Sequence, residues 1–207
     1  MLKIDFHMHT HYSQDSILSP RLFLKTCRKL GITPIVTDHD TIKGNLKLKC
    51  KILAEEISTV EGDLIGLFLT DFIPPKLSAA ETIDRIKAQD GLVYAPHPFD
   101  RLRRSTLQKG LPPKLKLDIV EIFNARVLNQ VYNARALAFA QQGHFLKAAS
   151  SDAHTHFEIG NAYTVMEDFS SKKEFLKNLK TATFHTRQAP MWIHAVSKSV
   201  RRLKQIL

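Results

Sequence analysis

Short apolar segments alternate along the whole chain with segments that carry helix start and stop signals. This alternation is typical of β-α units that pack around a parallel sheet or barrel. The eight strands predicted from the apolar segments span residues 2–8, 33–37, 52–58, 64–69, 92–95, 118–123, 144–149 and 162–166. The sequence therefore predicts an α/β fold in which these strands form one sheet or barrel.

Helix signals lie between the apolar segments. Ser19-Pro20 has the N-cap serine and first-turn proline of a helix, and Gly31 is placed to end it. Two further helix starts have the serine and glutamate spacing of a capping box, Ser78 with Glu81 and Ser171 with Glu174.

The last predicted helix runs from about residue 190 to residue 207 and is amphipathic. Its apolar residues recur three and four positions apart: Ile193, Val196, Val200, Leu203 and Leu207. One stripe of the helix can therefore dock on the body of the protein. We expect His194 at the surface, and we expect the helix's basic residues to face water: Lys198, Arg201, Arg202 and Lys204.

A length of 207 residues with 43% hydrophobic and 24% charged residues fits one globular domain over residues 1–207. No stretch approaches the roughly 20 apolar residues that a membrane span needs, so we expect no membrane contact. The first residues lack the apolar core of a signal peptide. Two cysteines outside any C-x-x-C pair favour a reducing compartment, and we expect the protein in the cytoplasm.

The chain has 30 lysine and arginine residues against 20 aspartate and glutamate residues, a net charge of +10 that favours anionic partners. Basic residues concentrate in the last predicted helix and in residues 101–116, a polar stretch that follows the segment Ala95-Pro96-His97-Pro98. Each basic stretch is either a solvated face or a track for the phosphates of a nucleic acid.

Potential metal ligands follow the carboxyl ends of the predicted strands. His7 and His9 lie two residues apart on the first strand and therefore on one face of it. The others lie near or after the ends of later strands: His39, Glu56, His97, Asp152 and His154. Loops at the carboxyl ends of strands build the active site of a β/α barrel, so we expect these residues to converge. Charged groups at such density need a compensating cation, and imidazole and carboxylate ligands suit zinc, manganese or iron.

The motifs around these residues resemble those of the PHP (polymerase and histidinol phosphatase) phosphoesterases, in the order typical of that family. The matching segments are Asp5-Phe6-His7-Met8-His9-Thr10 with Ser13 and Asp15, Thr37-Asp38-His39-Asp40-Thr41 with Gly44, Glu56-Ile57-Ser58-Thr59, Ala95-Pro96-His97-Pro98, Glu121-Ile122-Phe123-Asn124-Ala125-Arg126 and Ser151-Asp152-Ala153-His154. An H-x-H motif alone is weak, but all six segments in order are specific.

The resemblance implies a distorted seven-stranded β/α barrel of the TIM-like type that holds two or three divalent ions, zinc, manganese or iron. Carried over position by position, it gives these metal ligands: His7, His9, Asp15, His39, Glu56, His97, Asp152 and His154. Asp63 and Asn124 stand where family members often have histidines. Asp63 either substitutes as an oxygen ligand or leaves that position without a ligand, so the number of ions stays open.

The same resemblance implies that a phosphate ester is hydrolysed by metal-activated water at a di- or trinuclear site. Asp40 is the candidate for protonating the leaving oxygen, although it can equally cap a helix that begins near Thr41. Asp5 and Asp38 are expected to orient the imidazoles. The candidates for holding the substrate are Arg101, Arg103, Asn124 and Arg126, the arginines through bidentate hydrogen bonds to phosphate.

The sequence therefore predicts a metal-dependent phosphoesterase that acts on small phosphate monoesters, with nucleotides or the ends of short oligonucleotides favoured. Nucleic acid is a further expected partner, through the basic loop and tail.

An amidohydrolase also carries H-x-H on a first barrel strand, but 207 residues leave little room for eight β/α units with lids. A PHP module that binds metals without catalysis is an alternative of a different class. The oligomeric state stays open.

Overall fold

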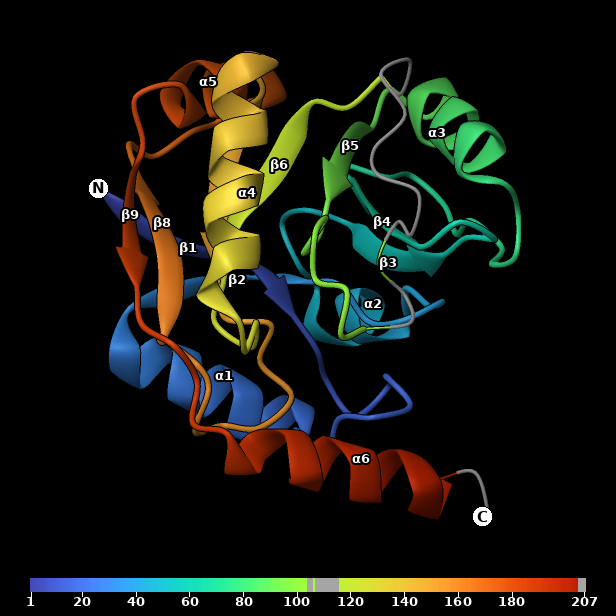
Figure 1. Cartoon of the computed structure of the whole chain (residues 1–207), viewed down its shortest axis with the longest axis vertical. Coiled ribbons are helices and arrows are strands. Elements are labelled where there is room, and N and C mark those ends of the chain that lie inside the picture. Colours follow the sequence, from blue (N-terminus) through green and yellow to red (C-terminus); the bar gives the residue numbers. More distant parts are fainter. Residues whose placement is uncertain (104–105, 107–115, 205–207) are drawn as a thin grey trace.

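The computed structural model describes residues 1–103, 106 and 116–204 (Figure 1). The strands in this part of the chain are β1 (Leu2–Met8), β2 (Ile32–Val36), β3 (Ala54–Ser58), β4 (Asp63–Leu67), β5 (Leu92–Ala95), β6 (Ile119–Asn124), β7 (Leu146–Ser150), β8 (Ala162–Met166) and β9 (Thr183–Thr186). The helices are α1 (Pro20–Leu30), α2 (Lys43–Leu48), α3 (Ala79–Ala88), α4 (Gln130–Gln142), α5 (Lys172–Leu179) and α6 (Trp192–Lys204). Most of the predicted basic loop, including Arg104, Lys109 and Lys114, lies outside the described residues, as does Leu207.

The strands pair in two sheets. The first has the order β2-β1-β8-β9 and the second the order β3-β4-β5-β6-β7. Parallel pairs such as β1 with β2 and β6 with β7 occur beside antiparallel pairs such as β3 with β4. The α/β fold is confirmed. The expected seven-stranded barrel is not, because the described residues form nine strands in two sheets without closing a barrel.

The two sheets meet at two seams. After β2, Asp40 N–H donates to Glu56 C=O at 2.9 Å and Glu56 N–H donates to Asp38 C=O at 3.3 Å, around one isolated bridge to β3. Between β7 and β8, the Thr164 hydroxyl accepts from Ala149 N–H at 3.0 Å and lies 3.2 Å from Ala149 C=O. A closed barrel pairs each strand with its neighbours around the whole circumference. These seams replace that ladder with local contacts, which explains the division into two sheets.

The predicted helix caps are confirmed. Ser19, Ser78 and Ser171 each accept a hydrogen bond from a first-turn backbone N–H, at 3.4, 3.1 and 3.2 Å. Gly31 ends α1 in the left-handed conformation at φ +65°, where glycine has no Cβ to clash. The sequence does not predict β9, because Thr183–Thr186 holds one apolar residue and forms an exposed or half-buried edge of the first sheet.

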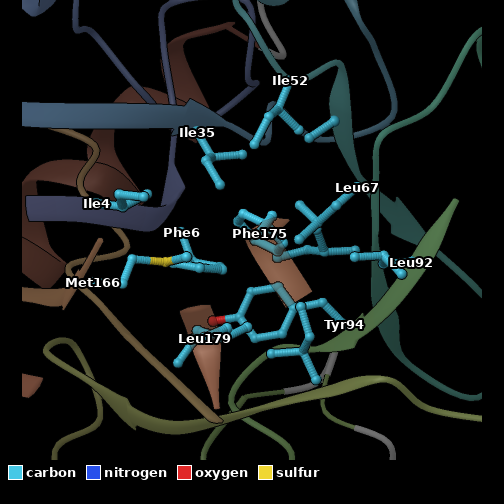
Figure 2. Packing of buried hydrophobic residues seen from close by; sticks show 14 of the residues in the cluster. Ile4, Phe6, Ile35, Ile52, Leu67, Leu92, Tyr94, Met166, Phe175 and Leu179 are labelled. Carbon is cyan, nitrogen blue, oxygen red and sulfur yellow. The ribbon is translucent and has the colours of Figure 1, made fainter. Parts of the chain in front are cut away.

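The main hydrophobic core takes residues from both sheets and from α5 (Figure 2). Phe6 of β1, Tyr94 of β5 and Phe175 of α5 are fully buried there. The ring centroids of Phe6 and Phe175 lie 5.6 Å apart, and those of Phe6 and Tyr94 lie 6.2 Å apart in an edge-on arrangement. This shared core fixes the two sheets against each other and so fixes the strand ends that carry the polar residues.

The C-terminal helix α6 lies across one end of the molecule (Figure 1). Ile193 packs with Ala125, Ala162 and Ala189, so the predicted docking stripe is confirmed at this position. The basic residues of the helix, Lys198, Arg201, Arg202 and Lys204, are exposed as expected, and Lys204 in addition donates to main-chain oxygens of the loop after β1. Neither α6 nor any other described helix combines the length and apolar character that crossing a membrane requires.

We predict that Phe175→Ala lowers the free energy of unfolding by about 3 to 5 kcal/mol, because it opens a cavity among fully buried rings. Chemical denaturation monitored by circular dichroism measures this loss. Phe157→Ala is the matched control, since its side chain is 60% exposed and should cost less than about 1 kcal/mol. Equal losses in the two variants would contradict the assignment of the core.

Candidate metal centre

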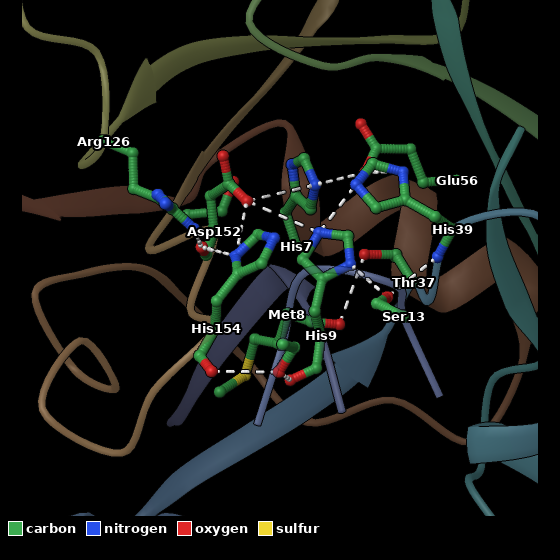
Figure 3. A network of polar contacts seen from close by, with 12 residues as sticks. His7, Met8, His9, Ser13, Thr37, His39, Glu56, Arg126, Asp152 and His154 are labelled. Atoms are coloured by element: carbon green, nitrogen blue, oxygen red, sulfur yellow. Dashed lines mark hydrogen bonds and ion pairs between the residues drawn. The ribbon is translucent and has the colours of Figure 1, made fainter. Parts of the chain in front are cut away.

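All eight predicted metal ligands lie in one cluster beside the seam between β2 and β3. His7 belongs to β1 and Glu56 to β3, and the other six follow β1, β2, β5 and β7: His9, Asp15, His39, His97, Asp152 and His154. Figure 3 shows the imidazoles of this cluster gathered between the carboxylates of Glu56 and Asp152. Residues 147 positions apart in the sequence, His7 and His154, thus share one site.

Glu56 occupies the centre of the cluster. Its carboxylate, 1% exposed, lies 3.1 Å from His7 Nε2, 3.3 Å from His9 Nε2, 3.2 Å from His39 Nδ1 and 3.3 Å from His97 Nε2. Burial alone would raise the pKa of Glu56, but the His39 and His7 rings outweigh burial and hold the pKa well below its usual range. Glu56 is therefore an ionised carboxylate shared among four imidazoles.

Asp152 supplies a second buried carboxylate on the opposite side of the rings. Its Oδ1 lies 3.4 Å from His9 Nε2 and 3.7 Å from His7 Nε2, and its Oδ2 lies 2.7 Å from Arg103 Nη1. Burial acts to raise the pKa of Asp152, yet Arg103 and His7 bring it well below the ordinary value. In return, Asp152 and Glu56 raise the pKa of His9 to about 9 against the effect of burial. The two carboxylates thus attract positive charge into the cluster.

Asp15 and His154 form the outer edge of the cluster. Asp15 Oδ1 lies 3.1 Å from His154 Nε2, and Asp15 Oδ2 lies 3.7 Å from His39 Nε2. Burial and the nearby Arg126 guanidinium lower the pKa of His154 to about 3. The His154 ring is therefore neutral near pH 7, which is the form of imidazole that ligates metals.

The cluster fits divalent metal ions. Four overlapping groups have ligand atoms within 4.8 Å of one another: His7, His9 and Glu56; His7, His97 and Asp152; His9, His39 and His154; and His39, Glu56 and Asp63. Buried His9 Nε2, His39 Nδ1 and Asp152 Oδ1 have no hydrogen-bond partner among the described residues. Such atoms are costly to bury, and an ion would satisfy them. Imidazoles and carboxylates without thiolate suit zinc, manganese or iron.

Glu121 and Ser13 contact the Nδ1 atoms of two of the imidazoles, on the side of each ring away from Nε2. Glu121 Oε1 lies 3.2 Å from His7 Nδ1 and accepts from the Tyr94 hydroxyl at 3.0 Å, while Ser13 Oγ lies 2.9 Å from His9 Nδ1. These contacts direct both Nε2 atoms toward Glu56 and Asp152, as outer partners of metal-binding histidines do. This role of Glu121 was not predicted from the sequence. The one local signal for it is that Glu121 is a single acidic residue inside the apolar segment of β6.

Asp5 and Asp38 were expected to orient the imidazoles, but neither carboxylate contacts an imidazole ring of the described residues, and Asp38 reaches one only through Ser13. Asp38 accepts from Thr10 N–H at 2.6 Å and from Ser13 Oγ–H at 3.0 Å, so it acts on His9 only through Ser13. Asp5 accepts from Ser151 N–H at 3.0 Å and joins β1 to the end of β7. Burial raises the pKa of Asp5 to about 7. Both aspartates therefore brace the loops that carry ligands.

Asp40 does not cap α2. The helix begins at Lys43 after Ile42, and Asp40 Oδ1 instead accepts from Ser58 N–H at 2.8 Å, across the seam to β3. Asp40 is partly exposed beside His39 in a second hollow of about 470 Å³. The helix-cap interpretation is wrong, and the role of Asp40 as a proton donor stays a prediction.

A cavity of about 650 Å³ opens beside the cluster, within the roughly 300 to 1,000 Å³ typical of small-molecule sites. Its wall includes four predicted ligands and four basic side chains: Asp15, His39, His97, His154, Arg103, Arg126, His194 and Arg201. Two predicted substrate residues, Arg103 and Arg126, thus line it, whereas Arg101 is exposed on the neighbouring turn. His194 was expected at the surface and lines the cavity instead.

Asn124 is buried among the carboxylates. Its amide N–H groups donate to Glu121 Oε2 at 3.0 Å and to Asp152 Oδ2 at 3.1 Å, and its carbonyl accepts from Arg126 N–H at 2.9 Å. The side chain therefore fixes two acidic residues of the site. Contact between Asn124 and substrate stays a prediction.

Comparison with known proteins agrees with the motifs. The chain is 38% identical over 194 residues to an uncharacterized protein of Methanocaldococcus jannaschii, MJ0417, an alignment that covers 88% of this chain and 81% of the relative. The family model described as PHP-associated matches residues 131–184. The chain belongs to the PHP family.

Solved structures show the same fold. A two-domain Bacteroides vulgatus protein with a predicted PHP-like metal-dependent phosphoesterase has a TM-score of 0.71 at 17% identity, over 90% of this chain and 65% of that one. The lesion-specific endonuclease Q of Pyrococcus furiosus has a TM-score of 0.64 at 17% identity, over 87% of this chain and 56% of that one. Endonuclease Q bound to a 27-mer duplex with an abasic lesion at the active site has a TM-score of 0.62 at 16% identity, over 87% of this chain and 56% of that one. The chain thus spans under two thirds of each.

We predict that Glu121→Gln weakens metal binding by about 10- to 100-fold, because the neutral amide holds the His7 ring less firmly. Competition with a fluorescent chelator measures the dissociation constant. Glu55→Gln is the matched control, since Glu55 accepts from Ile73 N–H at 3.1 Å and burial raises its pKa to about 8, so glutamine replaces a neutral side chain. Unchanged affinity in Glu121→Gln would contradict the assigned role.

Proposed function

We propose that this protein is a metal-dependent phosphoesterase that hydrolyses phosphate monoesters at a di- or trinuclear site. The observation that carries the proposal is a buried imidazole and carboxylate cluster that adjoins a cavity lined by Arg103 and Arg126. His7, His9, Asp15, His39, Glu56, His97, Asp152 and His154 would hold the ions, and Asp63 is a candidate further ligand. Bound divalent ions lower the pKa of water and neutralise phosphoryl oxygens.

The protein's own side chains would bind and orient the phosphate. Arg126 is buried, lies 3.5 Å from Glu158 Oε1 and donates to Ser197 Oγ at 3.0 Å, so its guanidinium is fixed at the cavity wall. Arg103 is fixed by Asp100 at 3.1 Å and by Asp152 at 2.7 Å. Planar guanidinium groups held in this way suit bidentate binding of phosphate oxygens. Asp40, beside His39, is the proposed donor of a proton to the leaving oxygen.

Nucleotides or the ends of short oligonucleotides are the favoured substrates. The net charge of +10 and the three arginines of the cavity wall, Arg103, Arg126 and Arg201, favour anions with several charges. The fold likeness to endonuclease Q, which acts on DNA, supports the same substrate class.

In this proposal the two sheets correspond to a distorted barrel that is open along the two seams.

Phosphate release by metal-stripped protein reloaded with manganese or zinc tests the proposal. The substrates are nucleoside monophosphates, nucleoside bisphosphates, histidinol phosphate and short oligonucleotides. We predict turnover of at least one nucleotide and a loss of more than about 100-fold in kcat for Asp152→Asn and for His154→Ala, since each removes a ligand.

His156→Ala is the matched control and should keep wild-type turnover, because His156 is two residues beyond His154 and its ring lies 3.8 Å from the Phe157 ring, centroid to centroid. Metal binding without release of phosphate from any substrate would overturn the proposal in favour of a non-catalytic module. Equal turnover in the wild type and in Asp152→Asn would place the chemistry elsewhere.

A further inference from the structure

One stripe of α6 carries polar side chains that line the site or contact its loops. The stripe consists of His194, Ser197, Arg201 and Lys204. Their spacing of three or four residues places them along one side of a helix that has 3.6 residues per turn. Arg201 is exposed like Lys198 and Arg202, but it lines the cavity, whereas Lys198 and Arg202 lie outside the cavity wall.

The helix is fixed to the site at two points along this stripe. Ser197 Oγ accepts from Arg126 Nη2 at 3.0 Å. Lys204 Nζ donates to the main-chain oxygens of His11, Ser13 and Ser16 at 2.6, 2.8 and 2.8 Å. These residues belong to the loop that carries Asp15. The wall that α6 adds to the cavity is therefore already formed.

Two cavity-lining side chains of the stripe have polar atoms without a partner among the described residues. Arg201 lies between the fixed residues Ser197 and Lys204, and His194 lies one turn before Ser197. Arg201 forms no ion pair with any residue of the described chain, in contrast to Arg103, which two carboxylates hold. His194 Nε2 is buried and has no hydrogen-bond partner within the described residues. An unpaired guanidinium and an unpaired imidazole nitrogen in one cavity are suited to an anionic oxygen.

We propose that Arg201 and His194 form an anion subsite that binds a second phosphate group of the substrate, one that is not hydrolysed. The subsite rests on the proposed function, because the hydrolysed phosphate is assigned to the metal cluster. Burial together with Arg126 and Arg103 lowers the pKa of His194, so its ring would act as a neutral hydrogen-bonding group beside the Arg201 charge. Arg201 and His194 thus select substrates with two phosphates.

Two substrate types share this chemistry. A nucleoside bisphosphate presents a second monoester, and an oligonucleotide with a terminal phosphate presents a phosphodiester. His194 and Arg201 are seven residues apart, about 10 Å along the helix at 1.5 Å per residue, so the subsite is long enough to follow a substrate along the wall. Both types are compared with a mononucleotide in the test.

The full-length protein is assayed with uridine 5′-monophosphate, uridine 3′,5′-bisphosphate and the 5′-phosphorylated dinucleotide pUpU. Arg201→Ala should lower kcat/KM for at least one two-phosphate substrate about tenfold more than for the monophosphate, chiefly through KM, since it removes a charge-assisted contact. His194→Ala should act in the same direction. Arg202→Ala, with the same change of charge one residue away, should leave the ratio within about twofold.

Equilibrium binding of the same three ligands provides a readout that does not need turnover. The wild type could be inactive and still bind a two-phosphate ligand more tightly than the monophosphate. If Arg201→Ala abolishes that preference, the subsite stands while the proposed function fails. Equal effects of Arg201→Ala and Arg202→Ala would overturn the subsite and indicate general surface charge. The same fold loss for all three ligands would also overturn it. A preference for pUpU alone or for the bisphosphate alone identifies the substrate type.

Discussion

The carboxylate of Glu56 lies within 3.3 Å of nitrogens from four imidazoles, and much of the structure depends on this contact. The main chain of Glu56 bonds to Asp38 and Asp40, on either side of His39, at the seam between the two sheets. The hydrogen bonds that join β3 to β2 therefore also place the carboxylate beside the His39 ring. Buried carboxylates and imidazoles packed this closely need cations, and the rise in the pKa of His9 reflects that demand.

Local sequence patterns predicted the elements of the fold but not their pairing. The apolar segments gave eight of the nine strands of the described chain, and serine caps gave the starts of α1, α3 and α5. The edge strand β9 was missed because Thr183–Thr186 is nearly polar throughout. The division into two sheets depends on contacts such as the Thr164 hydroxyl at Ala149, which join residues distant in sequence and have no local signal.

The candidate ligands could be predicted because histidines and carboxylates at strand ends are brought together by the topology, and all eight converge. The residues that position them were harder to predict. Glu121 faces His7 from β6, and which aspartate braces which loop depends on side-chain direction. The sequence did not predict that Arg201 and His194 line the cavity, because the docking of α6 against Arg126 and the loop after β1 is a tertiary contact. The described chain thus combines a predictable ligand set with a cavity wall that only the fold reveals.

We propose that the cluster around Glu56 is a multinuclear metal site that serves phosphate ester hydrolysis. The most direct measurement is anomalous diffraction from crystals of manganese- or zinc-loaded protein, collected on both sides of the metal absorption edge. Two or three anomalous peaks are expected at the cluster, each with imidazole nitrogens or carboxylate oxygens at roughly 2.0 to 2.2 Å. Loaded crystals with no peak at the cluster, or with peaks bound only to surface histidines, would contradict it.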